Sequence, residues 1–197
     1  MTDYVSGERG LDHVLWAVPD LDEGSAQFAA ATGVTPGNGG SHAGFGTRNT
    51  LASLGDQLYF EVISVDPAQD NARERAPRNG KRRAPEMHTF GIRGSGLEDY
   101  RDTARGLGLN ASDPVHMSRM RADGVKIQWR SIYIVDEIWG DMIPFLIDWM
   151  DSPHPCETTP KGLSMTEFCA LHPKADELRA LYDALGVRVP VRRAVTP

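Results

Sequence analysis

Two histidines and one glutamate have the residue types and the spacing of a site shared between two halves of the chain. His13 and His88 each stand in an apolar, strand-like segment, and each lies 20 residues before a glycine, Gly33 or Gly108. Glu61 is the single carboxylate of the apolar run LYFEVI. A buried carboxylate must be paired, protonated or bound to a metal, because burying it free is expensive.

Together these three side chains form a set of two imidazoles and one carboxylate. Such a set suits Zn, Fe, Mn, Ni or Co and can leave coordination positions open for a substrate. We therefore predict His13, Glu61 and His88 as metal ligands, and Glu61 also as the catalytic group that moves a proton. The alternative is that Glu61 forms a structural salt bridge.

The fourth ligand of such a site is not fixed by the pattern. When Gly55-Asp56 is aligned with Gly140-Asp141, the counterpart of Glu61 is Leu146. Asp148 lies two residues further along and would point to the same face of a strand. We treat Asp148 as a candidate ligand or substrate contact, with a surface carboxylate as the alternative.

Further candidate contacts to a substrate surround a glycine-rich stretch. His42 stands in the run GGSHAGFGTRN, which also contains Arg48 and Asn49. Glycines allow the backbone to approach a ligand closely. Arg48 is suited to bind a carboxylate or phosphate through two hydrogen bonds, Asn49 to orient a carbonyl, and Trp16 to wall an apolar pocket. The alternative is a polar strand with a surface arginine, and a tryptophan of the core.

The same order of elements occurs twice and then, incompletely, a third time, which predicts an α+β fold. The predicted units are a β-α-β-β-β module at residues 1–67, a second such module at 87–155 and a partial β-α-β unit at 156–197. Residues 35–46 are predicted as a loop or an irregular strand, and residues 142–150 and 164–171 as strands.

Residues 68–86 interrupt the repeat. Arginines and lysines stand here among Pro, Asn and Gly, with almost no apolar residues. We predict a basic, solvated linker between the modules. The alternatives are an anion-attracting rim over a pocket and a nucleic-acid arm, but no aromatic residues alternate with the charges as single-stranded nucleic acid would require.

Composition limits the partners and the compartment. The chain has 197 residues and a net charge of −6, which argues against nucleic acid or an anionic membrane as the main partner. We find no bilayer-spanning run and no hydrophobic signal segment. Two cysteines, Cys156 and Cys169, fit a reducing compartment better than a disulfide framework. We expect a cytoplasmic protein that binds a small molecule, without nucleic acid or membrane partners.

The paired modules, with His13 and His88 on their first strands and Glu61 on a fourth strand, resemble the glyoxalase/bleomycin-resistance/extradiol-dioxygenase group, the vicinal oxygen chelate superfamily. More narrowly, the runs LDHV, HAGFGTRN and YFE look like the glyoxalase-like domain family. The resemblance implies that the modules form a curved mixed sheet around a pocket. It also implies metal ligands from the first and fourth strands of each module, which are His13, Glu61, His88 and a position at Leu146 or Asp148.

The resemblance further implies a divalent-metal lyase or isomerase, with Zn, Ni, Mn or Fe, that acts on a small oxygenated substrate. Homodimers are common among the proteins it resembles, which implies a homodimer here. Two other functions remain open. One is a non-haem Fe(II) oxygenase with His13, His88 and Glu61 as its ligands. The other is a metal-free binding or resistance protein that holds a flat apolar ligand.

Overall fold

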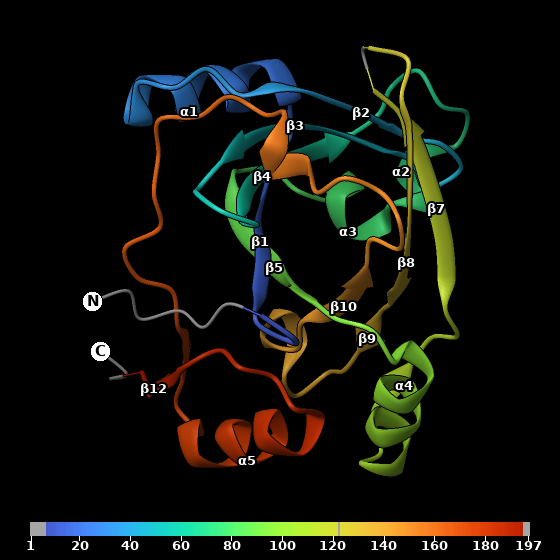
Figure 1. Cartoon of the computed structure of the whole chain (residues 1–197), viewed down its shortest axis with the longest axis vertical. Coiled ribbons are helices and arrows are strands. Elements are labelled where there is room, and N and C mark those ends of the chain that lie inside the picture. Colours follow the sequence, from blue (N-terminus) through green and yellow to red (C-terminus); the bar gives the residue numbers. More distant parts are fainter. Residues whose placement is uncertain (1–6, 122, 195–197) are drawn as a thin grey trace.

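The chain folds into two modules of the same design that join in one sheet (Figure 1). The computed structural model describes residues 7–121 and 123–194, apart from the side chain of Arg75. The first module consists of β1 (Leu11–Ala17), α1 (Leu21–Thr32), β2 (Gly37–His42), β3 (Thr47–Ser53) and β4 (Tyr59–Val65). The second consists of β5 (Glu86–Arg93), α4 (Leu97–Gly106), β7 (Val115–Met120), β8 (Lys126–Ile132) and β10 (Phe145–Asp148).

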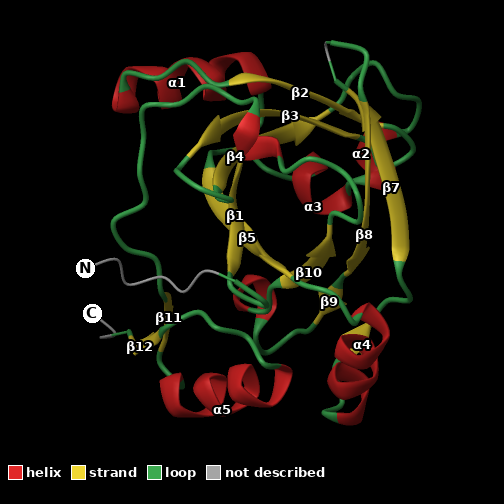
Figure 2. Ribbon diagram, viewed as in Figure 1, coloured by secondary structure: helices red, strands yellow, loops and turns green. Residues whose placement is uncertain are grey.

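One eight-stranded mixed sheet contains both modules, in the order β2-β3-β4-β1-β5-β10-β8-β7. The first strands, β1 and β5, pair antiparallel at its centre, and each pairs in parallel with the last strand of its own module. The halves are therefore related by an approximate two-fold axis between β1 and β5. The sheet curves until its end strands, β2 and β7, approach each other (Figure 2). The predicted α+β fold with a curved mixed sheet is confirmed.

Local sequence explains how the first module begins. The side chains of β1 alternate, so that His13 and Leu15 face the inside of the curved sheet and Val14 lies in the core on its outer face. Asp20 then caps α1, because its side chain accepts hydrogen bonds of 2.9 Å from two backbone N–H groups of the first turn. Gly33 ends the helix with φ of 76°, a left-handed conformation that glycine adopts without strain.

Helices cover the outer face of the sheet and leave the inner face for a site. On the first module, Phe28 of α1 packs near Val62 of β4. On the second module, Tyr100 of α4 and Leu178 of α5 (Ala175–Leu185) lie in one cluster with Leu146 of β10. Burial of these apolar side chains holds the curved sheet in place from outside.

The C-terminal segment forms a small unit of its own. It contains α5 and a two-stranded parallel sheet of β11 (Ala170–His172) and β12 (Val191–Arg193). The predicted strand at 164–171 is wrong for most of its length, since only its last two residues are in β11. No helix of the described ranges is long and apolar enough to cross a membrane.

Three other segments differ from prediction. Residues 37–42 form the edge strand β2 with a register shift between Asn38 and Gly40. Residues 68–86 contain two short helices, α2 (Ala72–Arg75) and α3 (Pro77–Gly80). The strand predicted at 142–150 is shorter, because a 3-10 turn at Gly140–Met142 and then Pro144, which has no N–H to donate, precede it. The remaining short elements are β6 (Asn110–Ala111), β9 (Ile134–Val135) and a 3-10 turn at Pro155–Glu157.

Candidate functional site

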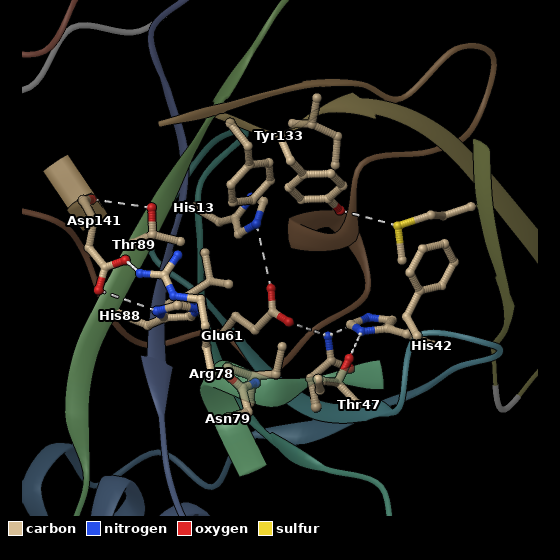
Figure 3. Close-up of a pocket in the computed structure, with 18 of the residues that line it drawn as sticks. His13, His42, Thr47, Glu61, Arg78, Asn79, His88, Thr89, Tyr133 and Asp141 are labelled. Atoms are coloured by element: carbon tan, nitrogen blue, oxygen red, sulfur yellow. Dashed lines mark hydrogen bonds and ion pairs between the residues drawn. The ribbon is translucent and has the colours of Figure 1, made fainter. Parts of the chain in front are cut away.

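A cavity of about 340 Å³ lies inside the curved sheet, and both modules line it (Figure 3). Its walls are mainly apolar and aromatic, and His13, His42, Asn49, Glu61 and His88 also line it. The apolar walls include Leu15, Ile63, Met117, Trp129, Phe145 and Ile147. This composition is typical of a pocket for a small molecule, in which a few polar groups fix the orientation of a largely apolar ligand.

Glu61 is held at one oxygen by a chain of hydrogen bonds. It is 4% exposed, and Nδ2 of Asn49 donates to its Oε1 at 2.8 Å. The same Nδ2 lies 3.2 Å from Nε2 of His42, whose Nδ1 lies 2.8 Å from Oγ1 of Thr47. Burial lowers the pKa of His42, so its neutral ring donates to Thr47 and accepts from Asn49. The chain fixes Glu61 with its other oxygen, Oε2, turned toward His13 (Figure 3).

His13 is fixed from behind by Asp12. Nδ1 of His13 lies 2.6 Å from Oδ1 of Asp12, and the ring stacks on Tyr59 with centroids 4.4 Å apart. Gly91 makes room for the ring, because a Cβ there would lie 2.6 Å from Cε1 of His13. Asp12 also accepts hydrogen bonds of 3.1 Å from Trp149 Nε1 and His154 Nε2.

The charge of Asp12 sets the proton arrangement of His13. Burial alone would raise the pKa of Asp12, but the hydrogen bonds from His13 and His154 outweigh burial and hold this pKa well below its ordinary value. Nδ1 of His13 therefore carries a proton directed at Asp12. In the neutral ring, Nε2 is then an acceptor that faces Oε2 of Glu61 at 3.5 Å. Two facing acceptors favour a proton or another cation between them.

The register of the sheet identifies the counterparts of these residues in the second module. His13 lies opposite Gly91, and Leu15 lies opposite Thr89, so the two-fold axis relates His13 to Thr89. The helices that follow support this alignment. They begin at Leu21 and Leu97, and the separation of 76 residues (97 − 21) is that between His13 and Thr89 (89 − 13).

The counterpart of Glu61 follows in the same way. Glu61 pairs with Leu15 and Phe145 pairs with Gly91, so the axis relates Glu61 to Phe145. Phe145 lines the cavity and its ring lies 5.2 Å from that of His13. A phenylalanine therefore stands where a fourth metal ligand was expected.

The two predicted candidates for that position are on the other face of the sheet. Leu146 is buried in the outer core, and Asp148 accepts a hydrogen bond of 2.9 Å from Arg130. Across the described residues, no group of three or more His, Cys, Asp or Glu side chains is placed to hold a metal ion. The chain thus offers His13 and Glu61 as one pair of ligands, and the full set that the resemblance implied does not fit.

His88 lies in a different polar cluster near the opening of the cavity. Nη2 of Arg82 lies 2.8 Å from its Nδ1, and Oδ2 of Asp141 lies 3.6 Å away (Figure 3). Arg78 pairs with the same Asp141. Burial, together with the guanidinium groups of Arg82 and Arg78, lowers the pKa of His88 to about 4. The structure therefore places His88 in the cavity wall, but not in a ligand group with His13 and Glu61.

Arg82→Met is expected to raise the pKa of His88, because it removes one of the two cations that disfavour the imidazolium. His88 has a folded pKa of about 4 against an ordinary value of 6.5, so the unfolded chain binds more protons between these pH values. The His88 contribution to stability is therefore lost as the pH falls from 6.5 to 4, and the loss should shrink in the variant. NMR titration of the His88 ring measures the pKa, with Arg179→Met in α5 as the control. An unchanged pKa would contradict the assignment.

Three predicted substrate contacts do not line the cavity. Alternation along β3 turns Asn49 inward and Arg48 outward, where its Nη2 lies 3.8 Å from Asp22. Trp16 packs near Phe60 in the cluster under α1. Asp148 faces outward as described above. Of the predicted contacts, His42 and Asn49 are at the site.

The structure adds residues that the sequence analysis missed. Asp12 had a visible signal, because it is a second charged side chain in the apolar strand that carries His13. Arg119 of β7 and Tyr133 also line the cavity. Their positions depend on long-range closure of the sheet, so no local pattern identifies them.

Two β-α-β-β-β modules, joined at their first strands in one curved sheet around a cavity, define the fold of the vicinal oxygen chelate superfamily. A sequence model described as glyoxalase-like domain matches residues 11–186, and the chain belongs to this family. A comparison with curated proteins finds no match.

Solved structures with the same fold include a hypothetical protein from Staphylococcus aureus. It is 17% identical, with a TM-score of 0.62 over 89% of this chain and 74% of that chain. A methylmalonyl-CoA epimerase from Mycobacterium tuberculosis is 21% identical, with a TM-score of 0.53 over 74% of this chain and 93% of that chain. A Streptomyces coelicolor methylmalonyl-CoA epimerase variant in complex with 2-nitronate-propionyl-CoA is 16% identical, with a TM-score of 0.50 over 73% and 97%. At these identities the likeness shows the fold alone.

Proposed function

We propose that this protein is a lyase or isomerase that moves a proton on a small oxygenated substrate bound in the cavity. The observation that carries the proposal is the orientation of Glu61. Asn49 holds its Oε1, while Oε2 faces Nε2 of His13 across 3.5 Å. A carboxylate fixed in this way, inside an apolar cavity, is suited to act as a general base or acid.

The chemistry begins at a carbon next to a substrate carbonyl. Oε2 of Glu61 accepts the proton from this carbon, and the electron pair of the C–H bond moves toward the carbonyl oxygen to give an enolate. Return of the proton to another face or atom completes an isomerisation, whereas loss of a leaving group from the neighbouring carbon completes a lyase reaction. His13 is the second group that can hold the proton, and Asp12 stabilises its charged form.

The fold relatives are consistent with this reaction class, since an epimerase is an isomerase. The family resemblance also implies a divalent metal, Zn, Ni, Mn or Fe, which would supply a Lewis acid. Only His13 and Glu61 are placed to bind it, while Thr89 and Phe145 occupy the related positions. The residues do not fit a four-ligand site, and we assign no step to a metal. An Fe(II) oxygenase would need His88 as a third ligand.

A metal-free binding protein is the second candidate. It is favoured by the aromatic rings of Tyr59, Trp129, Tyr133, Phe145 and Trp149, which all line the cavity, and by Phe145 at the position related to Glu61. Such a protein would bind a flat apolar ligand without changing it. The cytoplasmic location and the homodimer stay predictions from the sequence.

The deciding experiment follows deuterium from solvent into candidate substrates by NMR. A panel of 2-oxo acids, hydroxy ketones and branched acyl thioesters is incubated with the protein in D₂O, with and without added divalent metal. Exchange next to the carbonyl in at least one compound supports the proposal. Binding without exchange in every compound supports the binding protein instead. Elemental analysis of protein purified without a histidine tag tests the metal prediction, since His13→Ala and Glu61→Ala should both lose any bound metal.

A further inference from the structure

Arg119 is a buried cation in the wall of the cavity. It lies on β7, is 8% exposed, and lines the same cavity as Glu61. Its Nη1 donates to the carbonyl of Gly39 in β2. Within the described part of the chain, no Asp or Glu carboxylate lies at ion-pair distance from it, and its Nε and Nη2 groups donate to no residue.

The bond to Gly39 does not explain why this residue is an arginine. It joins the two end strands of the sheet, and an uncharged donor such as glutamine would make the same hydrogen bond. Burying a guanidinium is expensive unless an anion and further acceptors complete it. The remaining N–H donors of Arg119 form the planar fork that binds a carboxylate through two parallel hydrogen bonds.

Glycines next to Arg119 keep this side of the cavity open. A Cβ on Gly40 would lie 3.6 Å from Cδ and 3.9 Å from Nη1 of Arg119, and Gly40 has φ of +124°, which few other residues adopt. A Cβ on Gly39 would lie 2.1 Å from Oδ1 of Asn49. The same pair of glycines therefore accommodates Arg119 and also Asn49, the residue that orients Glu61.

We propose that Arg119 binds the carboxylate of the substrate, so that the substrate is a small carboxylic acid with its acidic C–H group directed at Glu61. The proposal rests on the proposed function for the role of Glu61, but the carboxylate site itself does not depend on it. A single guanidinium that shares the cavity with a carboxylate side chain suits a monoanion. A phosphate dianion would meet the repulsion of Glu61 with only one cation to balance it.

Calorimetric binding of matched acids and amides tests the proposal. The probes are pyruvate, 4-methyl-2-oxopentanoate and phenylpyruvate, each beside its primary amide and beside inorganic phosphate. At least one acid should bind more tightly than its amide and than phosphate. Arg119→Gln should weaken that acid by about 10- to 100-fold, the usual effect of losing hydrogen bonds to a charged group, and leave the amide unchanged.

Two further variants separate this site from the catalytic proposal. Arg48→Gln removes an arginine on the outer face of β3 and should leave both affinities unchanged. Glu61→Gln should abolish deuterium exchange and yet bind the acid at least as tightly, because a nearby negative charge is removed. If the exchange reaction fails while the acid preference depends on Arg119, the carboxylate site stands and the proposed function falls.

The proposal is overturned if no acid binds more tightly than its amide, or if Arg119→Gln weakens acid and amide equally, as a purely structural arginine would. It is also overturned if phosphate binds more tightly than every acid. Should Arg119→Gln not fold, competition on the wild-type protein decides. Acetate must then displace the bound acid while acetamide does not, and failure of acetate to compete overturns the proposal.

Discussion

Glu61→Gln is expected to lower the rate of deuterium exchange next to the substrate carbonyl by about 10²- to 10⁴-fold, the usual contribution of a positioned general base. Glutamine has nearly the same shape, and its amide oxygen can still accept the hydrogen bond from Asn49. The fold should therefore be retained while the acceptor for the proton is lost. NMR exchange rates measure the first effect and circular dichroism the second.

The matched control for Glu61 is Asp148→Asn, which neutralises a carboxylate on the outer face of β10. This variant should exchange at the wild-type rate. A wild-type rate in Glu61→Gln would show that another group accepts the proton. A loss of folded structure in Glu61→Gln would instead support a structural role for the carboxylate.

Asp12→Ala is expected to have the largest effect on stability, a loss of about 3–5 kcal/mol in the free energy of unfolding. The carboxylate accepts hydrogen bonds from His13, Trp149 and His154 in a fully buried position. Its removal leaves these donors without their acceptor. Urea denaturation at neutral pH, followed by tryptophan fluorescence, measures the change.

The control for Asp12 is Asp113→Ala. Asp113 pairs with Arg101 and Arg105 at the surface, where its side chain is 75% exposed, so the loss should stay below about 1 kcal/mol. The pH dependence gives a second check. The folded pKa of Asp12 lies below its ordinary value of 3.8, so its contribution is present above that pH and is lost as the pH falls through the folded pKa. A similar loss in both variants at neutral pH would contradict the central role of Asp12.

The residues found from the sequence are those whose position depends on local alternation. A charged or polar side chain in an apolar strand must face something that accommodates it, and this rule located His13 and Glu61. Asn49 and His42 were found through the glycine-rich stretch. The same alternation excludes Arg48, because a neighbour of the inward Asn49 must face outward. The paired modules followed from the repeat itself.

The residues that were missed depend on shifts of one residue. Aligning Gly55-Asp56 with Gly140-Asp141 selected Leu146, but the turn before Pro144 and the resulting register bring Phe145 to the related position. One residue of shift exchanges the two faces of a strand. His88 was matched to His13 by glycine spacing, yet a register irregularity between Leu15 and Trp16 makes Thr89 its counterpart. Such irregularities come from pairing between distant segments and leave no local signal.

The approximate two-fold axis that relates His13 to Thr89 and Glu61 to Phe145 separates two tasks that a single module would have to combine. The first module supplies the ionisable pair, and the second supplies walls such as Phe145, Trp129 and Tyr133. A laboratory selection for a new substrate therefore has a natural division of labour to use. Changes at the walls of the second module should alter which molecule is accepted, while the reaction performed on it stays in the first.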